Sequence, residues 1–191
     1  LSLTSSDETK LVYPFDFKLT VEFEICTNAI IVNHIIENKG IDTMLFSIGA
    51  HPGFNCKIGD YLEFEKKENI MAYQFDDNKI IKKEKVPFLD NDNIFTINKE
   101  TFYKDALILE NMKSTYLYIK SKQHNNLVKV NFGGAPFLGI WAKPGAEYVC
   151  IEPWYGIDDD YEDYGELKNK KGIQSLESLK RFSFKYKIEV L

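Results

Sequence analysis

The stretch that decides the fold is residues 15–25, Phe-Asp-Phe-Lys-Leu-Thr-Val-Glu-Phe-Glu-Ile, in which odd positions are apolar and even positions are polar. Successive side chains of a β-strand point to opposite faces, so this period of two predicts a strand with one buried face. The run 29–37 follows after a plausible turn at 26–28, and we expect the two runs to pair as a hairpin.

The same alternation continues along the chain. Residues 182–190 alternate throughout and predict a closing strand. Runs 115–121 and 127–132 predict one further hairpin, and runs 138–142 and 147–151 predict another. Repeated two-faced strands joined by tight turns are typical of an antiparallel β-sandwich or barrel. We therefore expect an all-β fold in which residues 1–191 form a single domain.

The remaining segments are less regular. Residues 61–110 contain short apolar runs around a charged, asparagine-rich stretch at 76–100, and we interpret them as loops and short strands. One or two turns of helix are expected between Gln174 and Leu179, since no longer helical stripe is present.

Composition excludes several classes of partner. The net charge is −5, and lysines are interleaved with acidic residues, so no basic stripe favours nucleic acid. The single arginine, Arg181, argues against a ligand that needs a bidentate phosphate clamp. No run approaches the roughly eighteen apolar residues of a membrane span, so no membrane partner is expected.

The cysteines indicate a reducing compartment. Cys26, Cys56 and Cys150 are odd in number and form no C-x-x-C pair, so the sequence predicts neither a disulfide framework nor a cysteine metal site. The first residues lack the layout of a signal peptide, and we expect a cytoplasmic protein. The chain begins at Leu1 rather than at methionine, so we expect that it has been processed or truncated or that its first residues lie outside the sequence given.

Two side chains suggest acid/base chemistry. His51 follows the apolar run 44–50 and precedes Pro-Gly, while Glu152 follows the run 147–151 and precedes Pro-Trp. A carboxylate base and an imidazole acid suit proton transfer on a neutral polyol. Burial would raise the pKa of Glu152 unless hydrogen bonds favour its anion. The alternatives are a glutamate tied to loop amides and a histidine that only makes structural hydrogen bonds.

Other polar and aromatic residues have two interpretations. Phe54, Trp141, Trp154 and Tyr155 suit either a sugar platform or a core. The acidic run 158–164 lacks EF-hand spacing, which favours a solvated, aromatic-rich loop over a calcium site. We assign no role to His34, inside an apolar strand, or to His124, in a predicted hairpin turn.

Five segments in order carry a family resemblance: FSIGAHPGFN (46–55), FYKDAL (102–107), FLGIWAKPG (137–145), CIEPWYGID (150–158) and KGI (171–173). Together they resemble the aldose 1-epimerase (galactose mutarotase) family and are closest to its LacX-like branch. The resemblance implies a β-supersandwich that binds hexoses in a groove and interconverts their α and β anomers. It implies no metal and no cofactor.

Carried over by position, the resemblance makes Glu152 the catalytic base, His51 the general acid and Asp105 a residue that binds sugar hydroxyls. We further predict that Phe54, Asn55 and Trp154 contact the sugar. The family's usual second histidine and arginine have no counterpart here. We therefore expect a fold that is incomplete at its N-terminal side and is covered by a second copy or a partner chain.

The implied mechanism is ring opening. Glu152 takes the proton of the anomeric hydroxyl while His51 protonates the ring oxygen, and closure after rotation about C1–C2 gives the other anomer. Such roles place the functional atoms on the order of 5–8 Å apart. Two alternatives remain open: a non-catalytic carbohydrate-binding module, and a hexose-phosphate epimerase, which the arginine count disfavours.

Overall fold

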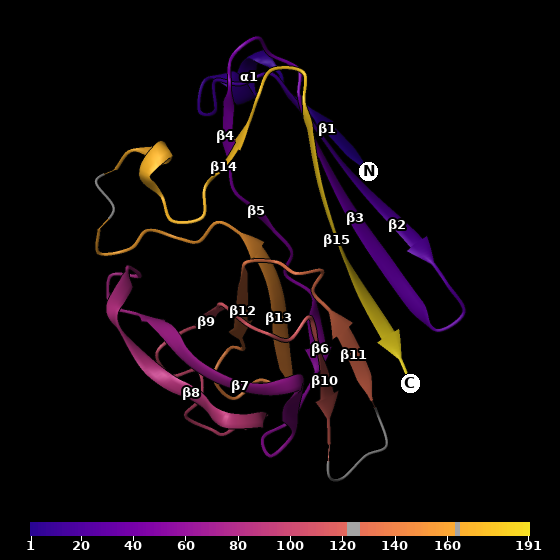
Figure 1. Ribbon diagram of the computed structural model, residues 1–191, viewed down its shortest axis with the longest axis vertical. Coiled ribbons are helices and arrows are strands. Elements are labelled where there is room, and N and C mark those ends of the chain that lie inside the picture. Colours follow the sequence, from indigo (N-terminus) through magenta and orange to yellow (C-terminus); the bar gives the residue numbers. More distant parts are fainter. Residues whose placement is uncertain (122–126, 163–164) are drawn as a thin grey trace.

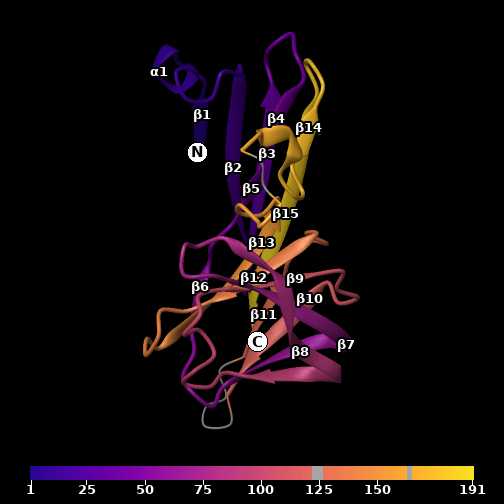
Figure 2. The ribbon, with the colours of Figure 1, turned by 90° about the vertical axis from the view of Figure 1, so that its left-hand side faces the viewer.

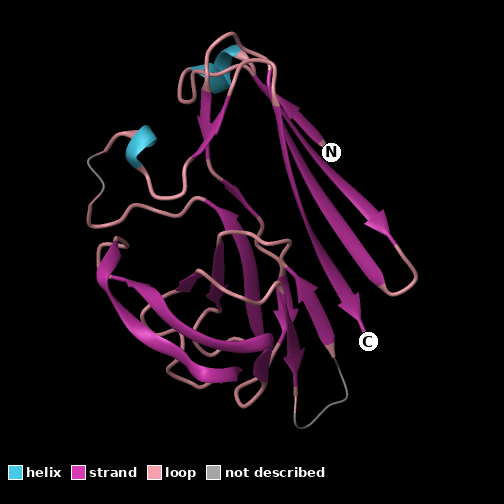
Figure 3. Cartoon of the chain, in the orientation of Figure 1, coloured by secondary structure: helices cyan, strands magenta, loops and turns pink. Residues whose placement is uncertain are grey.

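The structure is a computed structural model and describes residues 1–121, 127–162 and 165–191. Its regular elements are nearly all antiparallel β-strands (Figures 1 and 3). The strands are β1 (Ser2–Thr4), β2 (Phe17–Ile25), β3 (Ala29–Asn38), β4 (Met44–Phe46), β5 (Ile48–Gly49), β6 (Gly53–Asn55), β7 (Tyr61–Phe75), β8 (Ile81–Thr96), β9 (Leu107–Glu110), β10 (Tyr116–Lys120), β11 (Val128–Asn131), β12 (Phe137–Trp141), β13 (Tyr148–Tyr155), β14 (Gln174–Leu176) and β15 (Arg181–Val190). One short α-helix, α1 (Asp7–Lys10), and one 3₁₀ turn, η1 (Leu167–Asn169), complete the described elements.

One large sheet folds over to make the sandwich. Its order is β1-β2-β3-β15-β11-β10-β7-β9-β12-β13-β5, with β6 also on β13 and β8 also on β7. The long strand β7 pairs with β10 through its first residues and with β9 at Tyr73, which joins the two layers. The main core lies between the layers, where Leu62, Leu117 and Ile140 are fully buried. The predicted antiparallel β-sandwich is confirmed.

One end of this large sheet, called the upper sheet below, consists of β1, β2, β3 and β15. It rises beyond the sandwich along the longest axis (Figures 1 and 2). The predicted hairpin and closing strand are confirmed, since β2 and β15 both pair with β3. The apolar face of this sheet packs through Val32 and Phe184 against Tyr155. At its free end, however, Phe23 is 58% exposed and Ile25 is 82% exposed.

Both predicted C-terminal hairpins also form as strand pairs. β10 pairs with β11, and β12 pairs with β13. The predicted turn that holds His124 lies outside the described residues. Within the part of the chain that is described, no helix is long and apolar enough to cross a membrane.

Two segments differ from the sequence-based expectation. Residues 76–100, part of a region predicted as loops and short strands, contribute the 16-residue strand β8, which forms a long pair with β7 whose register shifts at several points. These bulges interrupt the alternation of side chains between the two faces, so no continuous period of two appears in the sequence. The helix predicted between Gln174 and Leu179 is wrong: residues 174–176 form β14, which pairs with β4. Tertiary pairing overrides the weak helical preference of so short a segment.

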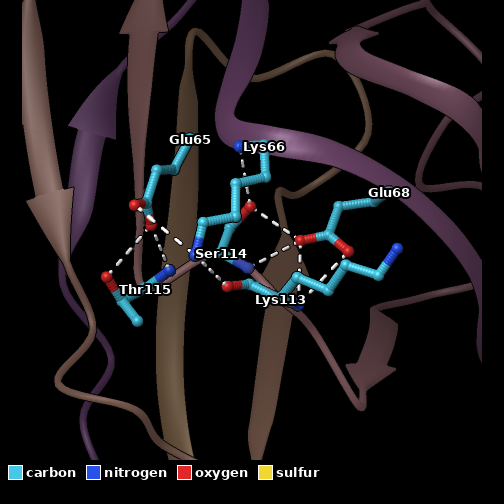
Figure 4. A network of polar contacts seen from close by, with 6 residues as sticks. All are labelled: Glu65, Lys66, Glu68, Lys113, Ser114 and Thr115. Carbon is cyan, nitrogen blue, oxygen red and sulfur yellow. Dashed lines mark hydrogen bonds and ion pairs between the residues drawn. The ribbon is translucent and has the colours of Figure 1, made fainter.

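A buried carboxylate fixes the bulged part of β7. Glu68 is 1% exposed, and its Oε1 accepts hydrogen bonds from the backbone N–H and the hydroxyl of Ser114, each at 2.7 Å. The backbone N–H of Lys113 also donates to it, at 2.9 Å. Figure 4 shows Glu65 bound to Thr115 in the same way. Glu68 therefore ties the loop after β9 to β7 and has a structural role.

Candidate active site

One face of β13 presents Glu152 and Trp154, the two side chains of this strand that line the groove of the site. Alternation along the strand directs Val149 and Ile151 into the main core and leaves Cys150, Glu152 and Trp154 on the opposite face. Glycines lie beside this row: Gly139 is opposite Glu152, and Gly49 is opposite Trp154. Because these neighbours have no side chain, the sheet has room for the indole ring of Trp154.

The backbone around His51 holds the imidazole beside this row. β5 and β6 both pair with β13, and the chain passes between them through His51-Pro52. The N–H of Ala50 donates to the carbonyl of Pro153 at 3.1 Å, and the N–H of Ile151 donates to the carbonyl of Pro52 at 3.2 Å. These bonds anchor the chain on both sides of His51.

The structure brings His51 and Glu152 together. His51 Nε2 lies 3.4 Å from Glu152 Oε1, closer than the 5–8 Å expected from the sequence. The carboxylate side chain is 3% exposed, whereas the imidazole is 60% exposed and packs edge-on against Trp141. One group is therefore buried and fixed, while its partner reaches solvent.

The environment of Glu152 favours its protonated form. Burial raises the pKa of Glu152 from 4.5 to about 7, and the negative charge of Asp105 acts in the same direction. A hydrogen bond from the Trp154 side chain acts in the opposite direction and is outweighed. Glu68 is equally buried but accepts several hydrogen bonds, so the two buried glutamates have different surroundings. A carboxylate with this pKa suits a base that works near neutral pH.

A groove of about 450 Å³ opens over the pair. Its lining includes His51, Glu152, Trp154 and Asp158, with the Ile48-Gly49 backbone along one wall. A groove of this size, with one aromatic wall and few polar groups, suits a small polar ligand.

Two predicted sugar contacts lie elsewhere. Phe54 is opposite Val149 and packs against the main core. Of the two interpretations of this residue, a core position therefore holds. Asn55 and Phe54 line a second, larger groove of about 820 Å³ near Val128 and Leu191. That groove contains neither His51 nor Glu152, so the structure does not bring Phe54 and Asn55 to the acid/base pair.

Asp105 lies just before β9 and acts on Glu152 through its charge. Its backbone has a φ of 73°, its Oδ1 accepts a hydrogen bond from the N–H of Ala106 at 2.9 Å, and its other oxygen contacts Lys79 Nζ. It is not part of the lining of the smaller groove. The structure therefore places Asp105 at the margin of the site.

Sequence reasoning missed a polar cluster on the same face. Glu110 accepts hydrogen bonds from Lys85 at 2.6 Å and Tyr73 at 2.7 Å, and Lys171 lies 2.8 Å away. Burial alone would raise the pKa of Glu110, but these donors outweigh it and lower the pKa to about 2. Glu110 pairs with Phe137, which pairs with Trp154, so one row of the sheet joins the cluster to the site. Its members come from four separate segments, and only strand register reveals the link.

His34 does not join the pair, whereas Asp158 of the acidic run lines the groove above it. His34 is buried and stacked on Phe184, as its position in an apolar strand suggests. In the acidic run, Asp158 is exposed, and Asp159 contacts Lys170. The last two residues of the predicted aromatic-rich loop, 163–164, lie outside the described residues. One group with metal-ligand atoms is present among described residues, formed by His51, Cys150 and Glu152.

The fold is a β-sandwich that carries a buried carboxylate beside an exposed imidazole, and comparison with known proteins identifies its family. The family model for aldose 1-epimerase matches residues 1–163, so the chain belongs to the aldose 1-epimerase family. Among its relatives are the plasmid and chromosomal LacX proteins of Lactococcus lactis subsp. lactis, each 27% identical over 190 residues. The match covers 94% of this chain but 64% of each LacX protein, so the chain spans about two thirds of the length of these relatives.

Solved structures show the same fold. A galactose mutarotase related enzyme from Lactobacillus acidophilus superposes with a TM-score of 0.90 at 28% identity, covering 100% of this chain and 66% of that one. A galactose mutarotase-like protein from Lactobacillus casei gives a TM-score of 0.91 at 19% identity, with 100% and 68% covered. The predicted family and its LacX-like relationship are confirmed.

Proposed function

We propose that this chain carries the acid/base site of an aldose mutarotase, which interconverts the α and β anomers of a hexose. The observation that carries the proposal is the 3.4 Å approach of His51 Nε2 to Glu152 Oε1 on a groove walled by Trp154. An isolated buried carboxylate would have only a structural use, but one paired with an exposed imidazole can exchange protons with a ligand. The three free cysteines support a reducing, cytoplasmic setting.

In the proposed reaction Glu152, as carboxylate, takes the proton from the anomeric hydroxyl. His51, protonated, gives a proton to the ring oxygen, and the C1–O5 bond breaks to leave an aldehyde at C1. Rotation about C1–C2 presents the other face of the carbonyl, and ring closure returns both protons. The cycle neither gains nor loses atoms, so the two side chains supply all of the proton transfer.

The sugar is placed by groups around the pair. The indole of Trp154 forms an apolar wall for the C–H face of a pyranose. Asp105, at the margin, is proposed to accept hydrogen bonds from sugar hydroxyls. Phe54 and Asn55 lie at the other groove, so we no longer assign them to the sugar.

The test is polarimetry of freshly dissolved α-glucose and α-galactose with the 191-residue chain. Glu152→Gln keeps the shape of the side chain but cannot act as a base, so we expect anomerisation to fall by about 10²–10⁴-fold. The control is Glu147→Gln, which changes an exposed glutamate on the approach to β13 and should leave the rate unchanged. An unchanged rate in Glu152→Gln would show that another group is the base.

A second measurement separates enzyme from binding module. Trp141 and Trp154 both lie near His51 or Glu152, so bound sugar should alter their fluorescence. Sugar-dependent fluorescence in the wild-type chain without faster anomerisation would favour the non-catalytic binding module. Fluorescence change together with catalysis supports the mutarotase.

A further inference from the structure

We propose that His51, Cys150 and Glu152 form a binding site for a zinc ion, and that this ion inhibits the acid/base pair. The binding part stands on the geometry alone, whereas the inhibitory part rests on the proposed function. The ligand atoms of the three side chains all lie within 4.8 Å of one another. The sequence did not suggest this group, since Cys150 has no cysteine partner in the chain.

The arrangement comes from strand geometry. Cys150 and Glu152 are two residues apart on β13, so both point to the same face. Position 53, opposite Cys150, is a glycine, and a methyl group there would only reach ordinary contact with Sγ at 3.6 Å. The thiol is therefore not covered by a side chain from the neighbouring strand β6. His51 approaches the same place from the loop between β5 and β6.

The distances suit zinc. Zinc binds imidazole nitrogen, carboxylate oxygen and thiolate sulfur at about 2.0–2.3 Å, so ligand atoms of a tetrahedral site lie roughly 3.3–3.6 Å apart. The observed 3.4 Å between His51 Nε2 and Glu152 Oε1 already has this length. The distances from the Cys150 thiol to the other two ligand atoms must shorten by at most about 1.5 Å, which rotation of the exposed His51 side chain and small adjustments of the Cys150 and Glu152 side chains provide.

The donor set selects the kind of ion. Calcium and magnesium prefer oxygen ligands alone, whereas a thiol with an imidazole and one carboxylate favours zinc or a similar borderline-soft ion. Binding displaces the thiol proton of Cys150 to solvent, so a thiolate becomes the ligand. Because His51 and Glu152 line the open groove, the ion can enter there and keep water at a fourth position.

Zinc at this position blocks catalysis directly. The ion occupies the Nε2 of His51 that would carry the acidic proton and the Glu152 oxygen that would accept one. It also lies where the anomeric oxygens of a sugar would bind. Zinc is therefore expected to compete with sugar and to be removed reversibly by a chelator.

Cobalt(II) is the probe for binding, because a thiolate ligand gives it a near-ultraviolet charge-transfer absorption. We expect one equivalent to bind the 191-residue chain, with zinc displacing it. Cys150→Ser should remove the absorption, and His51→Ala, at an exposed side chain that can be lost without unfolding, should weaken binding by more than the roughly 10–100-fold typical of losing an outer-shell partner. The control is Cys26→Ser, which removes an exposed thiol far along the chain. It should change neither the absorption nor the affinity for cobalt.

Absence of the cobalt absorption in the folded wild-type chain, or its persistence in Cys150→Ser, would overturn the site whether or not the chain is a mutarotase. In polarimetry, zinc should slow the wild-type chain, a chelator should restore it, and Cys150→Ser should stay active and become insensitive. Stoichiometric binding that leaves anomerisation unaffected would overturn the inhibitory part. A chain without anomerase activity that still shows the cobalt signal would disprove the proposed function and support the metal site.

Discussion

The indole ring of Trp154 lies directly against the Cα atom of Gly139. A methyl group added at Gly139 would lie 2.7 Å from Cζ2 and 2.8 Å from Cη2 of the ring, closer than real side chains pack. Gly49 is opposite Trp154 on the other neighbouring strand. The two glycines therefore set the height of the indole above the sheet and thus the wall of the groove.

Gly139→Ala is expected to displace this ring. Overpacking costs about 1–3 kcal/mol, and the partly buried indole can move more easily than the backbone. We expect a higher KM for sugar, a smaller effect on kcat, and altered tryptophan fluorescence. Gly53→Ala is the control, since its methyl group meets Cys150 Sγ at an ordinary 3.6 Å. Equal effects of the two variants on KM would refute the role of the ring.

Glu152→Gln is expected to stabilise the fold at alkaline pH. An acid whose pKa is raised on folding holds its proton more tightly in the native state, so stability falls as pH rises from 4.5 to about 7. This rise in the pKa of Glu152 lowers the free energy of unfolding by roughly 3 kcal/mol at most. Urea denaturation should show the variant more stable than wild type at pH 8 and nearly equal to it at pH 4.

Glu68→Gln supplies the opposite case. The Glu68 carboxylate accepts hydrogen bonds from Lys113 and Ser114. In the glutamine variant an amide nitrogen replaces one oxygen, and it cannot accept hydrogen bonds from these donors. We expect a loss of about 1–3 kcal/mol at pH 8. Stabilisation by both substitutions, or by neither, would contradict the distinction between a reactive and a structural buried carboxylate.

Most of the fold was predictable because its strands bury one face. The alternating segments 15–25 and 182–190 form β2 and β15 in the structure. The apolar runs before and after 143–146 form β12 and β13. β7 and β8 were not predictable, since several bulges shift their register and no single period describes them.

The site was predictable only in part. Glu152 and His51 each end an apolar run, and that position is visible in the sequence. Phe54 follows His51 closely, but alternation turns its side chain into the core. Cys150 and Glu110 carried no local signal, because their neighbours come from other strands and depend on register.

The exposed end of the upper sheet is expected to cause self-association. Phe23 and Ile25 are mostly exposed on β2, and residues 22–25 have no described partner on the side where β1 pairs. Exposed apolar groups on a free strand edge favour pairing between copies. Light scattering after size exclusion should show oligomers for the wild-type chain and fewer for the Phe23→Lys/Ile25→Lys variant. A wild-type monomer with a cooperative thermal transition would disprove this prediction.

Lys171→Met is expected to weaken the fold at neutral pH more than in acid. The pKa of Glu110 is lowered to about 2, so its contribution is present above 4.5 and is lost as pH falls toward 2. Loss of one charged hydrogen-bond donor should cost about 1.5–3 kcal/mol at pH 7. The control is Lys168→Met, whose pair with Glu166 is exposed and should matter little. An equal loss at pH 7 and pH 2.5 would rule out the ionised Glu110 as the cause.

The charge on Asp105 is expected to set the pH dependence of anomerisation. Glu152 acts as a base only when ionised, so the ascending limb of the wild-type pH–rate profile should have its midpoint at about 7, whereas the descending limb reports loss of the His51 proton. Asp105→Asn removes a negative charge that raises the pKa of Glu152, so the midpoint should move to lower pH. Lys79→Gln removes the cation that contacts Asp105, so the midpoint should move to higher pH. The two shifts have opposite signs, although both variants lose the same ion pair. Polarimetric rates between pH 5 and 9 measure them, and shifts in the same direction would show that the contact, rather than the charge of Asp105, acts on Glu152.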